Sequence, residues 1–192
     1  MDFSVGTASS VIKKFNTSGL VQSLKSATKN YIHMAVTPDH KKAIIWDITT
    51  SFQVVSLVDM ETTFDSRAMT ASPTADITQK ITFSKDSSLA IIETDNINPL
   101  LIYSMTSYNI VHQIPISAQI YSAHFLDSSN ELIAIFTNIS FIIVNLTTLN
   151  EFHMDKFNSS IFATDGLGNI FTCNNNTIKQ YLVTYTPIID ET

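Results

Sequence analysis

The segment Asp76–Ser117 limits the fold most strongly, because much of the chain looks like copies of it. It holds four short apolar runs rich in Ile, Leu, Val, Phe and Tyr, and turn-forming residues separate them. The runs are Gln79–Phe83, Leu89–Ile92, Leu100–Tyr103 and Asn109–Ile114. Runs of this length and composition, bounded by Asp, Asn, Ser and Pro, are typical of β-strands. Four of them joined by short connections predict one antiparallel meander.

The break after the first run recurs along the chain, and each copy carries an aspartate. These residues are Asp39, Asp86, Asp127 and Asp165. Their spacing is roughly forty residues, which is the range of a four-stranded propeller blade. Aspartate favours turns because its side chain accepts hydrogen bonds from nearby backbone N–H groups. The repeat therefore predicts an all-β fold, a β-propeller of four-stranded antiparallel blades, with these carboxylates in turns.

Alignment on these turns divides the 192 residues into about five blades of a single propeller domain. The approximate boundaries are 1–28, 29–75, 76–117, 118–156 and 157–192. The first blade begins late, with Phe3–Ala8 as its second strand. In the second blade we expect the fourth strand near Arg67–Ala71, within the irregular segment Met60–Ala75, which also supplies an enlarged loop.

The inner strands are predicted to be covered on both faces. The segments Leu132–Phe136 and Phe141–Val144 contain no polar residues. In a strand that is exposed on one face, apolar and polar residues alternate. Stacked blades provide such double coverage. The same alignment places Trp46 in a second strand and Cys173 in a buried second strand.

The chain resembles the WD-repeat family of β-propellers over nearly its whole length, most closely over Val5–Thr28. Phe15-Asn16 stands roughly where the family has Trp-Asp, at the end of a third strand. The dipeptide Trp46-Asp47 falls in a second strand instead. The family's Gly-His dipeptide before the first strand is missing, so the four polar residues that tie the family's blades together are not carried over to this chain. The resemblance implies a ring that commonly has seven blades. Five blades then make a small ring, an incomplete ring, or part of a seven-bladed one.

Charge is distributed unevenly along the chain. The net charge is −6, which disfavours a general polyanion binder, but residues 1–42 carry six lysines and two aspartates, a balance of +4. Such a basic region attracts a charged partner, or keeps exposed blade rims soluble. The candidate binding residues are Lys13, Lys14, Lys25, Lys29, Arg67, Asp95 and Asn96.

Motifs for catalysis, phosphate binding or metal binding are missing from the sequence. Gly166-Leu167-Gly168 lacks the third glycine of a dinucleotide-binding loop, and the five histidines show no His-x-x-x-His spacing. We therefore expect no enzyme activity, no cofactor and no metal. The single cysteine excludes an intramolecular disulfide, and no apolar run suits a signal peptide or a membrane span. We expect an intracellular protein of the cytoplasm or nucleus.

The sequence favours a non-enzymatic scaffold that binds other protein subunits inside a multiprotein complex. Because the first blade lacks its own first strand, Phe3–Ala8 is expected to present an open edge, to which a partner can add a strand. The alternative is an RNA-associated propeller in RNA processing or ribosome biogenesis, which uses the lysine-rich N-terminal third. The third interpretation is a propeller enzyme or lectin.

Overall fold

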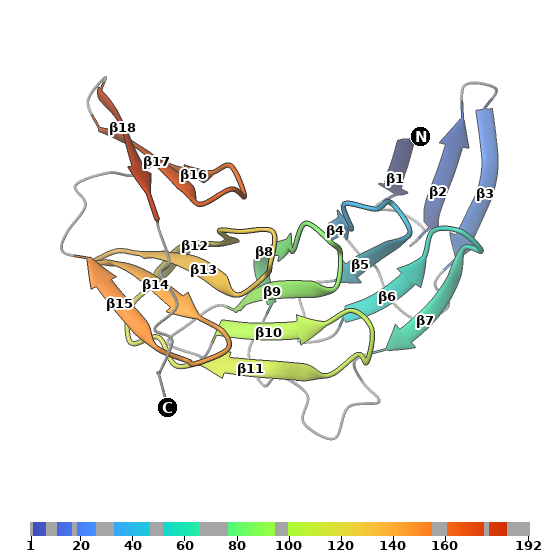
Figure 1. Cartoon of the computed structure of the whole chain (residues 1–192). Coiled ribbons are helices and arrows are strands. Elements are labelled where there is room, and N and C mark those ends of the chain that lie inside the picture. The colour runs from blue at the N-terminus through green and yellow to red at the C-terminus, as the bar shows by residue number, and fades with distance from the viewer. Residues whose placement is uncertain are drawn as a thin grey trace. The chain divides into compact units, whose positions relative to one another are not determined.

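In a computed structural model, the chain forms five antiparallel sheets, which we name A to E in chain order (Figure 1). The structure describes residues 2–6, 11–16, 19–25, 33–46, 52–65, 77–94, 100–154, 161–174 and 177–183. In each sheet, strands that follow one another in the chain pair side by side, so every sheet is a meander. The predicted all-β fold is confirmed, and no helix occurs among the described residues.

Two compact units divide the chain, Met1–Ser117 with sheets A to C and Ala118–Thr192 with sheets D and E. Sheet A consists of β1 (Asp2–Gly6), β2 (Val11–Asn16) and β3 (Gly19–Lys25). Sheet B consists of β4 (His33–Val36), β5 (Lys42–Trp46), β6 (Phe52–Ser56) and β7 (Glu61–Asp65). Sheet C consists of β8 (Ile77–Phe83), β9 (Leu89–Thr94), β10 (Leu100–Ser104) and β11 (Ile110–Ile114).

The second unit continues the same pattern. Sheet D consists of β12 (Ile120–Phe125), β13 (Leu132–Thr137), β14 (Phe141–Asn145) and β15 (Glu151–Met154). Sheet E consists of β16 (Ile161–Thr164), β17 (Asn169–Asn174) and β18 (Thr177–Leu182). Sheets B, C and D thus have four described strands, and sheets A and E have three.

The turn between the first and second strands is built in the same way in sheets B and C. Thr37 Oγ1 donates to Asp39 Oδ1 at 2.6 Å, and Ser84 Oγ donates to Asp86 Oδ1 at 2.7 Å. The same Oδ1 atom accepts the backbone N–H two residues further on, at 3.0 Å in both turns. Each first turn contains a residue with a positive φ: His40 (58°), Ser87 (65°), Asn130 (63°) and, in sheet E, both Gly166 (69°) and Gly168 (91°). The predicted role of the aspartates as turn residues is confirmed.

The turn between the third and fourth strands repeats as well. Tyr108 N donates to Ser104 O at 3.0 Å, and Leu149 N donates to Asn145 O at 2.8 Å. The donor residue adopts the left-handed conformation in each case, with φ of 58° and 57°, and Met60 has φ of 58° at the matching place. Large residues are uncommon in this conformation, so the geometry of the turn dictates it.

The expectation of a fourth strand near Arg67–Ala71 is wrong. The fourth strand of sheet B is β7, which starts at Glu61, because the turn that ends at Met60 reverses the chain directly after β6. Its register is set by pairs such as Gln53 with Asp65 and Ser56 with Glu61. The segment Arg67–Ala71 lies outside the described residues.

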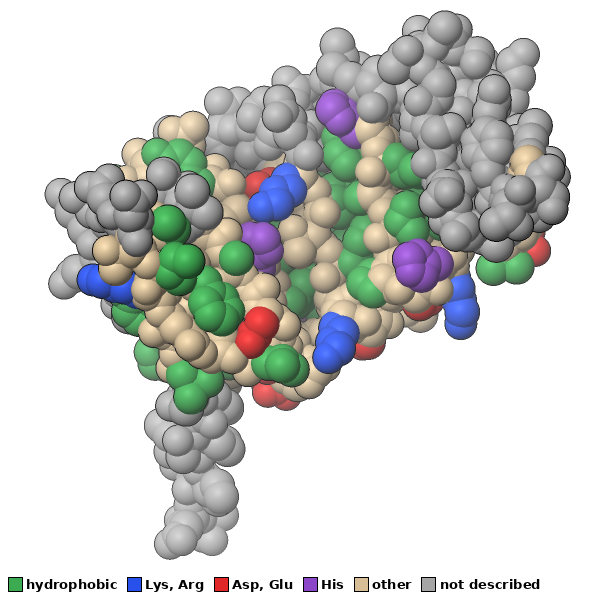
Figure 2. All heavy atoms as spheres, turned by 90° about the horizontal axis from the view of Figure 1, so that it is seen from above, with side chains coloured by type: hydrophobic (Ala, Val, Ile, Leu, Met, Phe, Trp, Pro, Cys, Tyr) green, Lys and Arg blue, Asp and Glu red, His purple; other side chains and the backbone are tan. Residues whose placement is uncertain are grey.

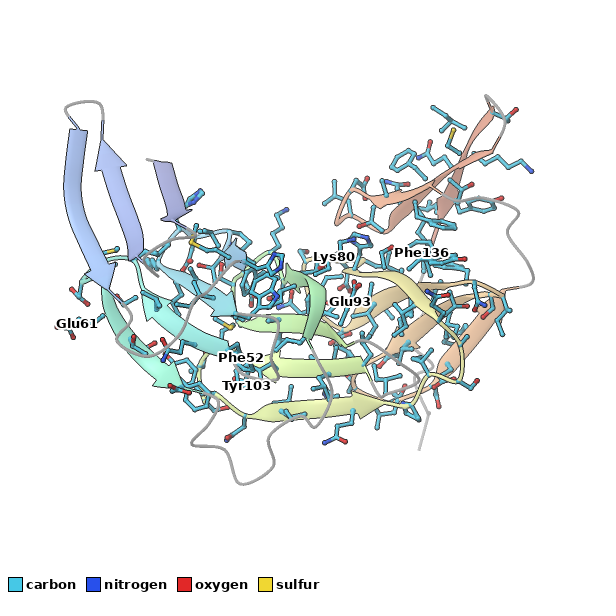
Figure 3. The ribbon with its side chains drawn as sticks, turned by 180° about the vertical axis from the view of Figure 1, so that it is seen from behind. Phe52, Glu61, Lys80, Glu93, Tyr103 and Phe136 are labelled. Atoms are coloured by element: carbon cyan, nitrogen blue, oxygen red, sulfur yellow. The ribbon has the colours of Figure 1, made fainter. Side chains whose placement is uncertain are left out.

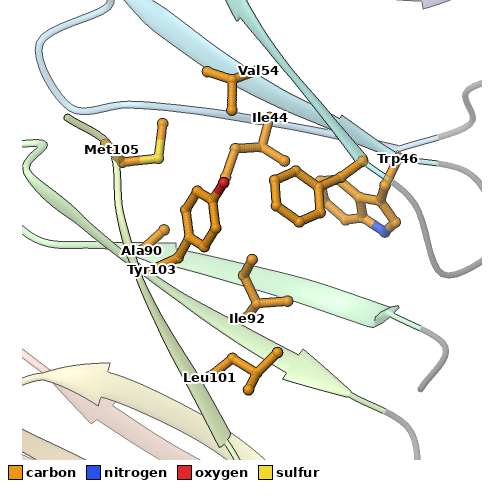
Figure 4. Packing of buried hydrophobic residues seen from close by; sticks show 9 residues of the cluster. Ile44, Trp46, Val54, Ala90, Ile92, Leu101, Tyr103 and Met105 are labelled. Atoms are coloured by element: carbon orange, nitrogen blue, oxygen red, sulfur yellow. The ribbon is translucent and has the colours of Figure 1, made fainter. Parts of the chain in front are cut away.

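Sheets B and C bury apolar side chains against each other. This cluster contains Ile44, Trp46, Phe52 and Val54 from sheet B with Ala90, Ile92, Leu101, Tyr103 and Met105 from sheet C (Figure 4). The rings of Phe52 and Tyr103 meet edge to face, with centroids 5.2 Å apart. Burial of side chains of this size contributes roughly 1.5–3 kcal/mol each. Trp46 lies in the second strand β5, as predicted, and pairs with His33 and Phe52.

Sheet D confirms the prediction of strands that are buried on both faces. All residues of β13 and β14 are buried. The face that carries Phe136, Phe141 and Ile143 packs on Ile170 of sheet E, and the rings of Phe136 and Phe162 stack at 4.2 Å. The residues on the other face of β13 are also buried, which is the environment that an inner propeller strand requires.

Candidate interaction surfaces

The open edge of sheet A is the first candidate surface. β1 pairs with β2 from Asp2↔Phe15 to Gly6↔Val11, and no described strand pairs with its other side. β3 leads directly into sheet B, as β7 leads into sheet C, so β3 is a fourth strand and β1 is a second strand. Among the described residues, sheet A therefore has no counterpart of β4, β8 and β12, the first strands of sheets B, C and D. An unpaired strand edge is a template for pairing with another chain.

Sheet E provides the second candidate surface. Its outer strand β18 holds the position of a third strand, and no described strand pairs with its other side. Ile178 and Leu182 project from one face of β18 and are 73% and 64% exposed. The opposite face carries Tyr181, which packs against the core of the second unit. On one face of sheet E, Tyr181 packs on the core, and on the other face Ile178 and Leu182 are in contact with solvent.

A cationic junction joins sheets B and C at their turns. Lys42 Nζ donates to Met105 O at 2.6 Å and lies 5.0 Å from the centroid of the Tyr108 ring. That ring stacks on Phe64 at 5.2 Å, and Tyr108 Oη donates to Thr63 Oγ1 at 3.4 Å.

The pKa values of two tyrosines at this junction are shifted in opposite directions. Partial burial would raise the pKa of Tyr108, but the hydrogen bond with Thr63 and the charge of Lys42 lower it below its ordinary value. Burial raises the pKa of Tyr103, and the neighbouring Tyr108 raises it further. Tyr103 Oη donates to the backbone carbonyl Tyr108 O at 2.6 Å, which fixes the Tyr103 side chain, and the Tyr108 ring is held by Phe64 and Lys42. The junction has the properties of a structural link between two blades.

Side chains that bind metal ions do not gather in the part of the chain that the structure describes. No group of three His, Cys, Asp or Glu residues suits a metal ion there. His33 stacks on Trp46 with ring centroids 5.3 Å apart, so this histidine packs on the core.

Figure 3 shows Lys80 and Glu93 as neighbours on β8 and β9 of sheet C, where Glu93 is buried.

None of the candidate binding residues predicted from the sequence has a described side chain. Lys13 and Lys14 lie on β2 and Lys25 ends β3, but only their backbone positions are described. The remaining residues, Lys29, Arg67, Asp95 and Asn96, lie outside the described residues. On the face seen in Figure 2, the described lysine and histidine side chains stand singly and do not form one basic patch.

Sequence reasoning missed the exposed face of sheet E. Cys173 was expected to be buried, but it is half-buried, because it lies on the same face as Ile178, with which it pairs. The alternation Ile178, Gln180, Leu182 was visible in the sequence. It does not reveal which face of the strand is covered, since Tyr181 on the other face is equally large.

The fold defines the chain as a β-propeller protein. Its structure superposes on a dihydro-heme d1 dehydrogenase, NirN, in complex with DHE, with a TM-score of 0.69, 6% identity, and coverage of 94% of this chain and 41% of that one. It also superposes on hydrazine synthase of Kuenenia stuttgartiensis, with a TM-score of 0.55, 9% identity, and coverage of 78% and 43%. The chain therefore spans about two fifths of the length of these structures.

Comparisons of sequence add no family. No protein-family model and no curated protein matches the chain. At identities this low, the structural matches establish the fold alone, and membership of the WD-repeat family is not shown. Among the described residues, no helix has the length and hydropathy of a membrane span.

Proposed function

We propose that this chain is a non-enzymatic protein-interaction module of the WD-repeat kind, which works inside the cell, in the cytoplasm or nucleus, as part of a multiprotein complex. The open edge of β1 is the observation that carries this proposal. A partner segment that adds a strand beside β1 gains main-chain hydrogen bonds and takes the place of a first strand, which no described residue of the chain fills. The propeller fold supports the proposal, because it holds such an edge on a rigid scaffold.

The RNA-associated alternative depends on residues 1–42 and their balance of +4. Of its six lysines, Lys41 and Lys42 have described side chains, and Lys42 is engaged with Met105 O and the ring of Tyr108. The two interpretations differ in salt dependence. Contacts to phosphates make affinity fall steeply as salt rises, whereas main-chain pairing depends weakly on salt.

Two of the structural neighbours are a dihydro-heme d1 dehydrogenase and a hydrazine synthase, so this fold also occurs in enzymes. Their sequences are 6% and 9% identical to this chain, which is too low to assign the activity of either enzyme to it. The described residues offer no cluster of ligands that favours an enzyme over a scaffold.

A pair of proline substitutions in β1 tests the proposal. In an antiparallel strand, the N–H groups of adjacent residues point to opposite sides, so one of Ser4 and Val5 points toward β2 and the other toward the open edge. Ser4→Pro and Val5→Pro each remove one donor. The tagged chain and its stoichiometric partners are purified from cells in parallel for both variants, in low and high salt, with and without nuclease.

We expect one variant to lower the melting temperature of the chain. The other keeps the melting temperature and weakens the assembly about 3- to 10-fold, the effect of one hydrogen bond of roughly 0.5–1.5 kcal/mol. The assembly should survive nuclease and high salt. If both variants retain their partners, or if the partners leave with the RNA, the proposal is wrong.

A further inference from the structure

The turn between β16 and β17 contains the one Asp-Gly dipeptide of the chain, Asp165-Gly166, and the sequence has no Asn-Gly. An aspartate that precedes glycine is chemically vulnerable, because the backbone nitrogen of glycine can attack the side-chain carboxyl without hindrance from a side chain of its own. The Asp165 side chain is exposed, and no atom of the described residues lies within 4 Å of a Cβ built on Gly166. Steric crowding therefore does not protect this pair.

Hydrogen bonds hold both oxygens of the Asp165 carboxylate. Oδ1 accepts the backbone N–H of Leu167 at 2.8 Å and that of Asn169 at 3.1 Å. Oδ2 accepts the side-chain amide Nδ2 of Asn169 at 2.6 Å. Gln180 Nε2 of β18 in turn donates to Asn169 Oδ1 at 3.0 Å. We call the side chains of Asn169 and Gln180 the carboxylate clamp.

The clamp keeps the carboxylate ionised. The hydrogen bond from the Asn169 side chain, helped by the backbone N–H groups, lowers the pKa of Asp165 below its ordinary value of 3.8. Donors that bind the charged form of a carboxyl group favour that form. In sheets B and C, the aspartates of the first turns are held by a hydroxyl of the same turn. In sheet E, the side-chain donor comes from β17 and is supported from β18, so the clamp depends on the pairing of these strands.

We propose that Asp165 is a site of conversion to isoaspartate, and that the carboxylate clamp sets the rate of this conversion. In the first step, Gly166 N attacks Asp165 Cγ and forms a C–N bond, and the amide proton leaves with the carboxyl hydroxyl as water. Water then adds to the cyclic imide. Addition at Cγ restores aspartate, and addition at the main-chain carbonyl leaves the backbone running through Cγ. The conversion uses sheet E alone and is independent of the proposed function.

The clamp slows the first step for two reasons. An ionised carboxylate has no hydroxyl group that can leave as water, and its oxygens are held by donors. The reaction therefore starts from a minor state in which the carboxyl group has left these donors. Removal of one donor raises the population of that state by the equilibrium constant of the lost hydrogen bond, about tenfold for a bond to a charged group.

Conversion at Asp165 should loosen sheet E from sheet D, because isoaspartate adds one carbon to the main chain of the turn. In the same turn, Gly168 N donates to Leu126 O of sheet D at 2.6 Å, and Gly168 O accepts Val183 N at 2.9 Å. Gly168 fits closely there, since a Cβ on it would lie 3.2 Å from Val183 O. A longer turn displaces Gly168 from these partners.

Peptide mapping with electron-transfer fragmentation measures isoaspartate at position 165 after incubation of the whole chain at neutral pH. The folded wild type should convert at least about tenfold more slowly than the same chain in denaturing urea. Folded Asn169→Ala and Gln180→Ala should convert faster than the wild type, and in urea all three chains should convert at one rate. Lys179→Ala is the matched control, since Lys179 is exposed on β18 and takes no part in the clamp. It should convert at the wild-type rate.

The proposal is overturned if position 165 stays aspartate even in urea, or if the folded wild type converts as fast as the unfolded chain. It is also overturned if the clamp variants remain folded by circular dichroism and convert at the wild-type rate. Should Asn169→Ala fail to fold, Gln180→Ala decides, because the Gln180 side chain is exposed. Hydrogen exchange at Gly168 tests the consequence: its amide should exchange faster in the converted chain, and unchanged protection would contradict the loosening of sheet E.

Discussion

The backbone amide of Asp39 donates a hydrogen bond of 3.0 Å to Ser87 Oγ, which joins the first turn of sheet B to the first turn of sheet C. Ser87, the residue that follows Asp86, has a φ of 65°. A corresponding link occurs in the second unit, where Gly168 N donates to Leu126 O at 2.6 Å. The first turns thus close each hairpin and also connect neighbouring blades, although their sequences have diverged.

Ser84 gives a direct test of this turn. Its buried hydroxyl donates to Asp86 Oδ1 and accepts from Leu89 N at 2.9 Å. Ser84→Val leaves both groups without that partner and should cost roughly 1–3 kcal/mol. Ser84→Thr keeps the hydroxyl, as Thr37 does in sheet B, and should cost less than about 1 kcal/mol. Urea unfolding of the two variants checks the difference. Equal losses would show that the hydroxyl contributes little.

The pKa of Asp39 predicts an acid-sensitive contribution to stability. Burial would raise this pKa, but the hydrogen bonds from Thr37 and Lys41, together with the charge of Lys41, lower it below 3.8. A lowered pKa adds stability that is fully present above pH 3.8 and is lost as the pH falls below it.

Asp39→Asn removes this titration while it preserves the shape of the side chain. The difference in unfolding free energy between wild type and variant should be larger at pH 6 than at pH 3. Urea melts at both pH values measure it. A difference that does not change with pH would contradict the assigned role of the carboxylate.

The junction of Lys42 and Tyr108 should contribute a measurable coupling energy. Lys42→Met removes the ammonium group that lies 5.0 Å from the ring centroid, and Tyr108→Leu removes the ring. A double-mutant cycle in urea should give a coupling of about 0.5–1 kcal/mol, the usual size of an exposed cation–π contact. Additive effects of the two substitutions would mean that the contact contributes nothing to stability.

Two isoleucines of the second unit test the assignment of inside and outside. Ile143 is 7% exposed in the core of sheet D, and Ile139 is 54% exposed in the turn before β14. Ile143→Ala should cost roughly 2–5 kcal/mol, as for other buried aliphatic side chains. Ile139→Ala should stay within about 0.5 kcal/mol of the wild type. Similar midpoints for both variants in urea would refute the assigned faces.

The sequence predicted the features that depend on local chemistry. The turn aspartates and the doubly apolar strands of sheet D follow from residue type and period, and the structure has both. It did not predict β7, because the turn that precedes it places Met60 in a left-handed conformation that its residue type does not indicate.

Whether a sheet face is exposed depends on the neighbouring sheet as well as on the residues of the strand. Ile178 and Phe52 hold matching positions, yet only Phe52 is covered, because sheet C lies against it. No pattern inside Thr177–Leu182 encodes whether a neighbouring sheet is present. The half-buried Cys173 and the exposed Ile178 were therefore not predictable from their own segments.

Hydrogen exchange at single amides of β1 tests the central claim, that partners add a strand to sheet A. In the isolated chain, the amides of Phe3, Ser4 and Val5 should alternate between slow exchange, where they pair with β2, and fast exchange, where they face the open edge. In the purified assembly, the fast amides should slow at least tenfold while the others change little. If the edge amides exchange equally fast in the assembly and in the isolated chain, no strand is added there and the account is contradicted.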